Sequence, residues 1–284
     1  MRWLQSRGQH LALIDEVKGG NGSARVPYPI GIRETVVVRS RAVGTGLVRV
    51  TVGGPQLAGF ESHASDEHVK LIYPDEHGEL RLPEPDGLVL KWPRPFPLAR
   101  EYTVRRYDAA SGELDIDIAL HGDGVGSNWA TSVEPGDILH VAGPPGGVIV
   151  PLNYDKYLLA GDLTALPAIA RWLEELPRDA VGWAFIEVAD SGEQIALSPP
   201  DGVEVHWLHR GDRPLGSDLL ADAARRAPVA SGERIYVWAA GEAGALKPLR
   251  RWVRDDLKLG KDDVNITGYW KRGVENYDDD HELR

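Results

Sequence analysis

A short run of charged, polar and aromatic residues carries the strongest chemical signal in this chain. Residues 100–105 read Arg-Glu-Tyr-Thr-Val-Arg. In an extended strand successive side chains alternate, so Arg100, Tyr102 and Val104 would share one face. Guanidinium groups bind phosphate in a bidentate fork, and a tyrosine ring offers a flat wall for an aromatic ligand. The run therefore fits a flavin dinucleotide site, and it also fits an ordinary strand with arginines on its solvent face.

A glycine-rich turn follows one strand later. Residues 121–130 read His-Gly-Asp-Gly-Val-Gly-Ser-Asn-Trp-Ala, and a short helix is expected to open near Ser127. Free amides at a helix N-terminus bind phosphate, and glycine lets the backbone approach a ligand closely. A glycine-rich turn by itself is weak evidence, and this one gains weight from its position after the arginine–tyrosine run.

Two more segments lie where expected strands end and helices begin. Residues 161–165 read Gly-Asp-Leu-Thr-Ala, and residues 238–242 read Trp-Ala-Ala-Gly-Glu. Doubly wound sheets bind ligands at such junctions. Gly241 would let a nicotinamide or ribose come close, whereas Asp162 and Thr164 fit helix capping as well as they fit ligand contact.

The elements that must position these residues change character near residue 150. Valine-rich or alternating segments predict strands over 35–39, 46–52, 68–73, 100–107, 113–120 and 138–142. The alternation of Leu114 and Ile116 with Asp115 and Asp117 is typical of a half-buried strand. These short strands predict an N-terminal antiparallel Greek-key β-barrel.

Beyond residue 150 strands alternate with helices. Strands are expected over 157–160, 181–188, 203–208, 235–239 and 264–267, and helices over 164–176, 217–226 and 243–257. Ser217 is the expected cap of the second helix. The pattern predicts a C-terminal doubly wound, mostly parallel α/β domain that binds a nucleotide.

We therefore divide the chain into three parts. Residues 1–30 form a loosely packed arm with a short helix near residues 3–14, residues 31–150 form the barrel domain, and residues 151–284 form the α/β domain. The acidic run Asp278–Asp280 is expected to lie in a solvated C-terminal tail.

Composition excludes several classes of function. With 32 basic and 43 acidic residues the net charge is −11, which argues against nucleic-acid binding. The chain has no cysteine, so disulfides, zinc-thiolate sites, iron–sulfur clusters and a cysteine nucleophile are excluded. Any redox chemistry needs an added cofactor. We expect no metal site, no membrane span and no signal peptide, and we expect a monomer in the cytoplasm.

Taken in order, the motifs resemble the siderophore-interacting protein family of ferredoxin-reductase-like flavoproteins. In the first half the resemblance lies in Arg-x-Tyr-Thr-x-Arg, His-Gly, Gly-Ser-x-Trp-Ala, Pro-Gly-Asp and Ala-Gly-Pro. In the second half it lies in Gly-Asp-x-Thr-Ala-Leu-Pro-Ala-Ile, Trp-Ala-Ala-Gly-Glu and Gly-Tyr-Trp-Lys-Arg-Gly. It covers residues 31–273. The resemblance implies an FAD-dependent ferric-siderophore reductase that takes electrons from NADPH or NADH, with a ferredoxin as an alternative donor.

The resemblance also implies a set of site residues. Contacts to FAD from the barrel would come from Arg100, Tyr102, Thr103, Val104, Arg105, His121, Gly126, Ser127, Trp129 and Ala130. In the second domain Asp162, Thr164 and Ala165 would face the flavin, and Gly241 and Glu242 would lie near the nicotinamide. Lys70, Lys271 and Arg272 would contact the anionic iron chelate. No side chain is implied as nucleophile, acid or base, and His121 is expected to act as a hydrogen-bonding group.

Some alternatives stay open. Leu163 stands where the family usually has Glu, and Pro145 stands where Arg is expected, and both departures bear on ligand preference. Arg210 and Arg213 fit the 2′-phosphate of NADPH and fit solvated loop charges equally. A general NAD(P)H:flavin electron-transfer reductase and a siderophore-binding flavoprotein without turnover are the alternative functions.

Overall fold

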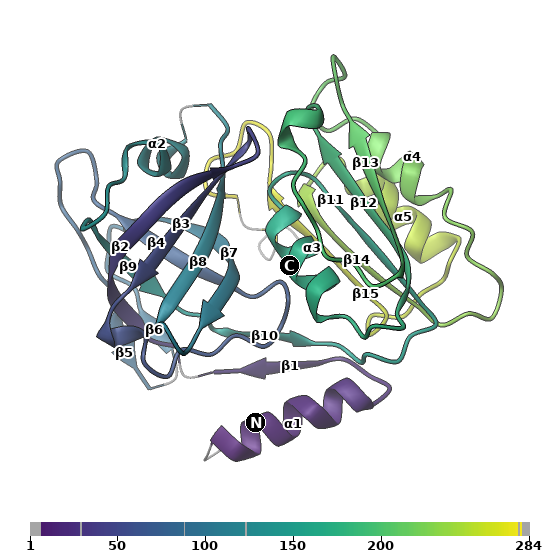
Figure 1. Ribbon diagram of the computed structural model, residues 1–284, viewed down its shortest axis with the longest axis horizontal. Helices are drawn as coiled ribbons and strands as arrows, with labels where there is room; N and C mark the ends of the chain where they lie inside the picture. The colour runs from purple at the N-terminus through teal and green to yellow at the C-terminus, as the bar shows by residue number, and fades with distance from the viewer. Residues whose placement is uncertain (1–6, 29, 88, 123, 278, 280–284) are drawn as a thin grey trace. The chain divides into compact units, whose positions relative to one another are not determined.

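The structure is a computed structural model that describes residues 7–28, 30–87, 89–122, 124–277 and 279 (Figure 1). The described chain forms two compact units. The first comprises residues up to Ile14 together with Ala24–Ile149, and the second comprises Asp15–Ser23 and the residues from Val150 onward.

The first unit is built around a closed antiparallel barrel. Its strands follow the order β2-β3-β8-β7-β4-β9, and β2 pairs with β9 to close it. The bounds are β2 Ile32–Val43, β3 Leu47–Gly53, β4 His68–Tyr73, β7 Leu98–Asp108, β8 Glu113–Ala119 and β9 Ile138–Ala142. All six strands were expected from the sequence, and the predicted barrel is confirmed.

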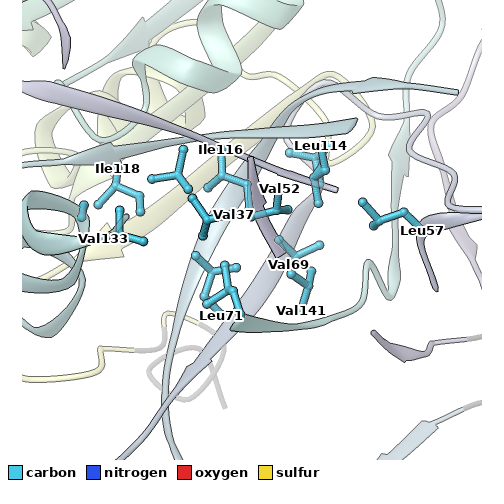
Figure 2. Packing of buried hydrophobic residues seen from close by; sticks show 14 of the residues in the cluster. Val37, Val52, Leu57, Val69, Leu71, Leu114, Ile116, Ile118, Val133 and Val141 are labelled. Atoms are coloured by element: carbon cyan, nitrogen blue, oxygen red, sulfur yellow. The ribbon is translucent and has the colours of Figure 1, made fainter. Parts of the chain in front are cut away.

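Branched apolar side chains fill the barrel interior. Figure 2 shows Val37, Val52, Val69, Leu114 and Ile116 among the side chains that pack there. Most of these residues are β-branched, and side chains of that kind pack well on a pleated surface. The barrel therefore has a packed apolar core of its own.

Strand β8 is buried on both faces, so the prediction of a half-buried strand is wrong. Asp115 and Asp117 are almost fully buried alongside the apolar residues between them. Strand β3 supplies their partners: Thr51 Oγ1 donates to Asp115 at 2.6 Å, and the Arg49 guanidinium donates to both oxygens of Asp117 at 2.6 and 2.7 Å. Buried carboxylates are tolerated because these donors replace water.

Smaller elements complete the first half of the chain. They are α1 Arg7–Gly19, β1 Ala24–Pro27, the 3-10 turn Pro55–Leu57, β5 Glu84–Asp86, β6 Val89–Lys91, α2 Val125–Ser132 and β10 Gly146–Ile149. Strand β1 pairs with β10, and β5 pairs with β6. The four strands were not predicted, because three or four residues are too few to show a period.

The N-terminal residues pack more firmly than the expected loose arm. Helix α1 is longer than predicted and ends at Gly19, and it buries His10, Ile14 and Val17. Residues 3–6 of the predicted helix lie outside the described residues.

The second unit holds a five-stranded parallel sheet in the order β13-β12-β11-β14-β15. The strands are β11 Lys156–Gly161, β12 Val181–Val188, β13 Gly202–His209, β14 Ile235–Glu242 and β15 Val264–Trp270. The helices are α3 Leu166–Glu175, α4 Leu219–Ala224 and α5 Lys247–Asp255, and a 3-10 turn spans Ser191–Glu193. Helix α3 covers one face of the sheet, and α4 and α5 cover the other (Figure 1). The predicted α/β architecture is confirmed.

All five carboxyl ends meet at one edge of this sheet. The chain moves from β11 outward to β12 and β13, and then returns to β14 on the other side of β11. The direction of winding therefore reverses beside β11, and open α/β sheets bind ligands at such a point.

Two helices and the tail differ in detail from the prediction. Helix α4 begins after Asp218, so Ser217 is not its cap. Helix α5 begins at Lys247 because turns occupy the preceding residues, and Pro248 then fits its first turn. The tail is not wholly solvated: Asp279 is buried and accepts from Arg250 and from the Gly268 amide. The other two aspartates of the acidic run lie outside the described residues.

Among the described helices, none has the length and apolar character needed to cross a bilayer.

Candidate functional site

In the first unit, helix α2 begins with amides that have no acceptor within the helix. Gly124 precedes it and supplies no side-chain cap. The Ser127 hydroxyl accepts from the His121 amide at 3.0 Å and donates to the Ala119 carbonyl at 3.2 Å. Ser127 thus ties the start of α2 to the end of β8. The backbone amides of the first turn are the groups placed to bind an anion.

An aromatic wall lies against this first turn. A Cβ atom on Gly126 would lie 1.7 Å from Tyr102 Oη and 3.6 Å from Tyr73 Oη, so only glycine fits there. The ring centroids of Tyr73 and Trp129 are 5.5 Å apart. Burial raises the pKa of both Tyr73 and Tyr102, so both hydroxyls stay neutral. The sequence did not identify Tyr73 as a site residue, because there it appears only as one more aromatic residue at the end of a predicted strand.

The two arginines of strand β7 have different surroundings. The β7–β8 pairing shifts register between Val104 and Arg106, and such a bulge re-aims the side chain within it. Arg105 is that residue, and its Nε lies 3.9 Å from an oxygen of Asp117, the carboxylate that Arg49 also binds. Two guanidinium groups therefore lie beside the one carboxylate of Asp117. Arg100 donates to the Ala99 carbonyl at 2.9 Å.

Other predicted residues of the barrel are less available to a ligand through their side chains. Val104 and Ala130 belong to the barrel core, so only their backbones can make contact. Thr103 is buried and lies opposite His68 on β4. The ring of His121 lies beside the start of α2, because a Cβ on Gly124 would be 2.9 Å from its Cε1.

In the second unit, Asp162 ties three strand ends together. Its Oδ1 accepts from the Thr164 amide at 2.9 Å and the Thr164 hydroxyl at 2.6 Å. Its Oδ2 accepts from the Glu242 amide and from Trp270 Nε1, each at 2.9 Å. A Cβ on Gly241 would lie 2.6 Å from that same Oδ2, so the glycine admits the carboxylate. Asp162 therefore organises the edge of the sheet at which the carboxyl ends of the strands meet.

The Glu242 carboxylate likewise accepts hydrogen bonds from backbone amides of two segments, one after β14 and one after β15. It is buried; its Oε2 accepts from the Ala245 amide at 2.7 Å, and its Oε1 accepts from the Arg272 amide at 3.2 Å. Ala165 is fully buried where α3 begins. Trp270 was not predicted as a site residue, although it lies in the Gly-Tyr-Trp-Lys-Arg-Gly motif used for the resemblance.

The structure also shows a buried acid that the sequence reasoning missed. Glu187 lies near the end of β12, and its Oε1 is 3.7 Å from Nη1 of Arg210, which follows β13. Burial and the nearby charge of Asp162 raise the pKa of Glu187 to about 7, although Arg210 and Arg213 act in the opposite direction. The available signal was an acid near the end of an otherwise apolar strand.

The cations expected to bind an iron chelate have partners of their own. Lys70 forms an ion pair with Glu101, and His68 Nε2 lies 3.8 Å from the same carboxylate. Burial alone would raise the pKa of Glu101, but His68 and Lys70 hold it below its usual range. Lys271 lies over the ring of Tyr277, with Nζ 5.6 Å from the centroid. Arg272 is exposed.

The arrangement in the first unit fits FAD. Arginine side chains and free helix amides suit a diphosphate, and the glycine start of α2 allows close approach beside an aromatic wall. Within the part of the chain that the structure describes, no group of three or more His, Asp or Glu side chains is placed to hold a metal ion.

Comparison with known proteins agrees with this arrangement. The family model described as siderophore-interacting FAD-binding domain matches residues 36–148, and the model for siderophore-interacting protein matches residues 154–273. The chain is 37% identical to the ferric vibriobactin reductase ViuB of Vibrio cholerae over 250 residues, which is 87% of this chain and 92% of that protein.

Two further relatives extend the comparison. The NADPH-dependent ferric-chelate reductase of Escherichia coli is 33% identical over 250 residues, covering 87% of this chain and 95% of that protein. The crystal structure of a siderophore utilization protein from T. fusca superposes with a TM-score of 0.85 at 42% identity, covering 91% of this chain and 99% of that chain. The chain therefore belongs to the siderophore-interacting protein family.

Proposed function

We propose that this chain is an FAD-dependent ferric-siderophore reductase that takes electrons from NADPH or NADH. The observation that carries the proposal is the start of helix α2, where Gly126 brings free amides against Tyr102 and Tyr73 beside the arginine strand β7. Family membership and the named activities of the relatives from V. cholerae and E. coli support it.

The chemistry divides between cofactor and protein. FAD, when bound, supplies the redox step, because a flavin accepts two electrons as hydride and returns them singly. The chain binds and orients the cofactor, the electron donor and the iron chelate, and none of its side chains needs to act as a nucleophile. Hard oxygen ligands hold Fe(III) more tightly than Fe(II), so the siderophore binds its iron less tightly once the iron has gained one electron.

Binding roles follow from the geometry of each unit. On the barrel, Arg100, Arg105 and the α2 amides hold the diphosphate, and Tyr102 forms a wall for the ring system. Thr103, His121, Gly126, Ser127, Trp129 and the backbones of Val104 and Ala130 complete this site. On the second unit Asp162, Thr164, Ala165 and Glu242 shape the edge of the sheet, and Gly241 lies near the nicotinamide. Arg210 and Arg213 accept the 2′-phosphate of NADPH, the donor that we favour.

The iron chelate requires local positive charge. Many ferric siderophores are anionic, and a chain at −11 repels them on average. Cations at a binding mouth focus such a ligand, and Lys70, Lys271 and Arg272 are our candidates. A ferredoxin donor, a monomeric state and a cytoplasmic location stay predictions.

Anaerobic reduction of the purified protein tests the function. Protein loaded with FAD should lose its flavin absorbance when NADPH is added, and ferric catecholate or hydroxamate added afterward should restore it and release Fe(II) to a ferrous chelator. Protein that carries no bound flavin after incubation with excess FAD and removal of the unbound FAD refutes the proposal. Flavin that is reduced but is not reoxidised by any ferric chelate would instead identify a general electron-transfer reductase, and chelate binding without flavin reduction would identify a binding protein.

A further inference from the structure

The carboxyl end of strand β12 pairs one buried acid with one partly buried arginine. The side chain of Glu187 is 6% exposed and that of Arg210 is 20% exposed. Their closest atoms are 3.7 Å apart, which is an ion pair but not a close hydrogen bond. Arg210 is therefore held electrostatically, and its guanidinium still reaches solvent.

The loop that carries Arg210 runs along the ligand edge of the sheet. The Arg210 amide donates to the Val188 carbonyl at 2.8 Å, which fixes the loop to the end of β12. At its other end, a Cβ on Gly216 would lie 3.2 Å from the carboxylate of Glu242, at the end of β14. Because β11 lies between β12 and β14, the loop extends across the point where the winding reverses.

This position has a chemical meaning in nucleotide-binding sheets. An acid near the end of the second strand of a β-α-β unit reads the ribose 2′-hydroxyl of NADH, whereas an arginine nearby accepts the 2′-phosphate of NADPH. Strands β11 and β12 with helix α3 form such a unit, and here both residue types are present and face each other.

Three charged groups act on Glu187 most strongly among the described residues. Asp162 acts on it from the end of β11, and Arg210 and Arg213 act from the loop after β13. The sheet face against α4 is lined by apolar side chains of that helix, such as Leu220 and Ala224. The carboxyl group is therefore poorly solvated, and Arg210 is its main counter-charge.

We propose, on the basis of the function proposed above, that Glu187 sets the preference between the two nicotinamide donors by holding Arg210 away from the 2′-phosphate of NADPH. When the phosphate binds, Arg210 exchanges one anion for another. The affinity gained from the phosphate is reduced by the attraction that Glu187 loses.

Calorimetric titration of the FAD-loaded protein tests this without turnover. Adenosine 2′,5′-bisphosphate carries the 2′-phosphate, and 5′-AMP lacks it. At pH 8, Glu187→Gln should bind the bisphosphate about tenfold more tightly than the wild type, the size of one partly screened charge interaction. Its affinity for 5′-AMP should be unchanged. Glu204→Gln, which removes an exposed acid from β13, is the matched control and should change neither affinity.

A second variant protects the test from a folding failure. Arg210→Gln should lose most of the preference for the bisphosphate and keep only the share due to Arg213, and adding Glu187→Gln to it should change that preference much less than in the wild type. The inference is overturned if Glu187→Gln leaves the bisphosphate affinity unchanged, if it shifts both nucleotides alike, or if Arg210→Gln keeps the full preference of the wild type for the bisphosphate. Each of these results can occur while NADPH still reduces the flavin, so they are distinct from failure of the proposed function.

Discussion

Replacement of Asp162 by asparagine is the most direct test of how the ligand edge of the second unit is assembled. The carboxylate accepts four hydrogen bonds, two from Thr164 and one each from the Glu242 amide and Trp270. An asparagine keeps the shape but carries only one acceptor oxygen. In either orientation of the amide, its NH₂ group faces two other donors, either the two from Thr164 or the Glu242 amide and Trp270 Nε1, and cannot bond to them.

The magnitude follows from those contacts. A hydrogen bond to a charged group contributes about 1.5–3 kcal/mol, and Asp162→Asn removes two of them. Partial exposure of Thr164 and Trp270 favours the lower end, so the free energy of unfolding should fall by about 3 kcal/mol. For a unit of this size such a loss lowers the melting temperature by about 6–12 °C.

Urea and thermal unfolding followed by circular dichroism measure this loss. Asp201→Asn, in an exposed turn, makes the same chemical change without the partners and should shift stability by less than about 0.5 kcal/mol. If Asp162→Asn were as stable as the wild type but no longer reacted with nicotinamide, the carboxylate would be a ligand-facing group, and the reasoning about strand ends would be wrong.

Four further substitutions test the three remaining parts of the site. Gly126→Ala forces a Cβ against Tyr102 and should yield colourless protein, measured as flavin absorbance per polypeptide. Glu187→Gln should be about 3 kcal/mol more stable than the wild type at pH 8, because the raised pKa of Glu187 means that burial penalises the ionised acid. This difference in the free energy of unfolding should shrink as the pH falls from 7 toward 4.5, where the wild-type acid becomes protonated. Chemical denaturation at several pH values measures the difference. Lys70→Ala should raise KM for an anionic ferric chelate with flavin content unchanged, and Glu101→Gln should lower it by releasing Lys70.

Matched controls sharpen these three outcomes. Thr131→Ala, near the other end of α2, should retain full flavin content. Glu204→Gln should show no pH-dependent gain in stability. A yellow Gly126→Ala protein, a Glu187→Gln protein that is less stable at pH 8 than at pH 5 relative to the wild type, or an unchanged KM for Lys70→Ala would each contradict the corresponding role.

Local patterns in the sequence determined much of the fold. Strands β4, β9 and β12 begin and end at the predicted residues, because their apolar runs and the turns around them depend on neighbours in the chain. The order of the motifs likewise indicated the family, the FAD site and the α/β second domain. Gly126 and Gly241 were predicted to let a ligand come close, which stays a prediction; in the structure the space beside them is taken by Tyr102 and Asp162 of the chain itself.

Only the tertiary structure decided what each polar side chain does. Asp162 looked like a helix cap or a ligand contact, and its further donors, Glu242 and Trp270, come from strands far along the chain. Asp115 and Asp117 alternate like solvent-facing residues, yet partners on β3 allow their burial. A carboxylate's hydrogen bonds and solvation depend on groups brought close by folding, and such contacts leave no period in the sequence.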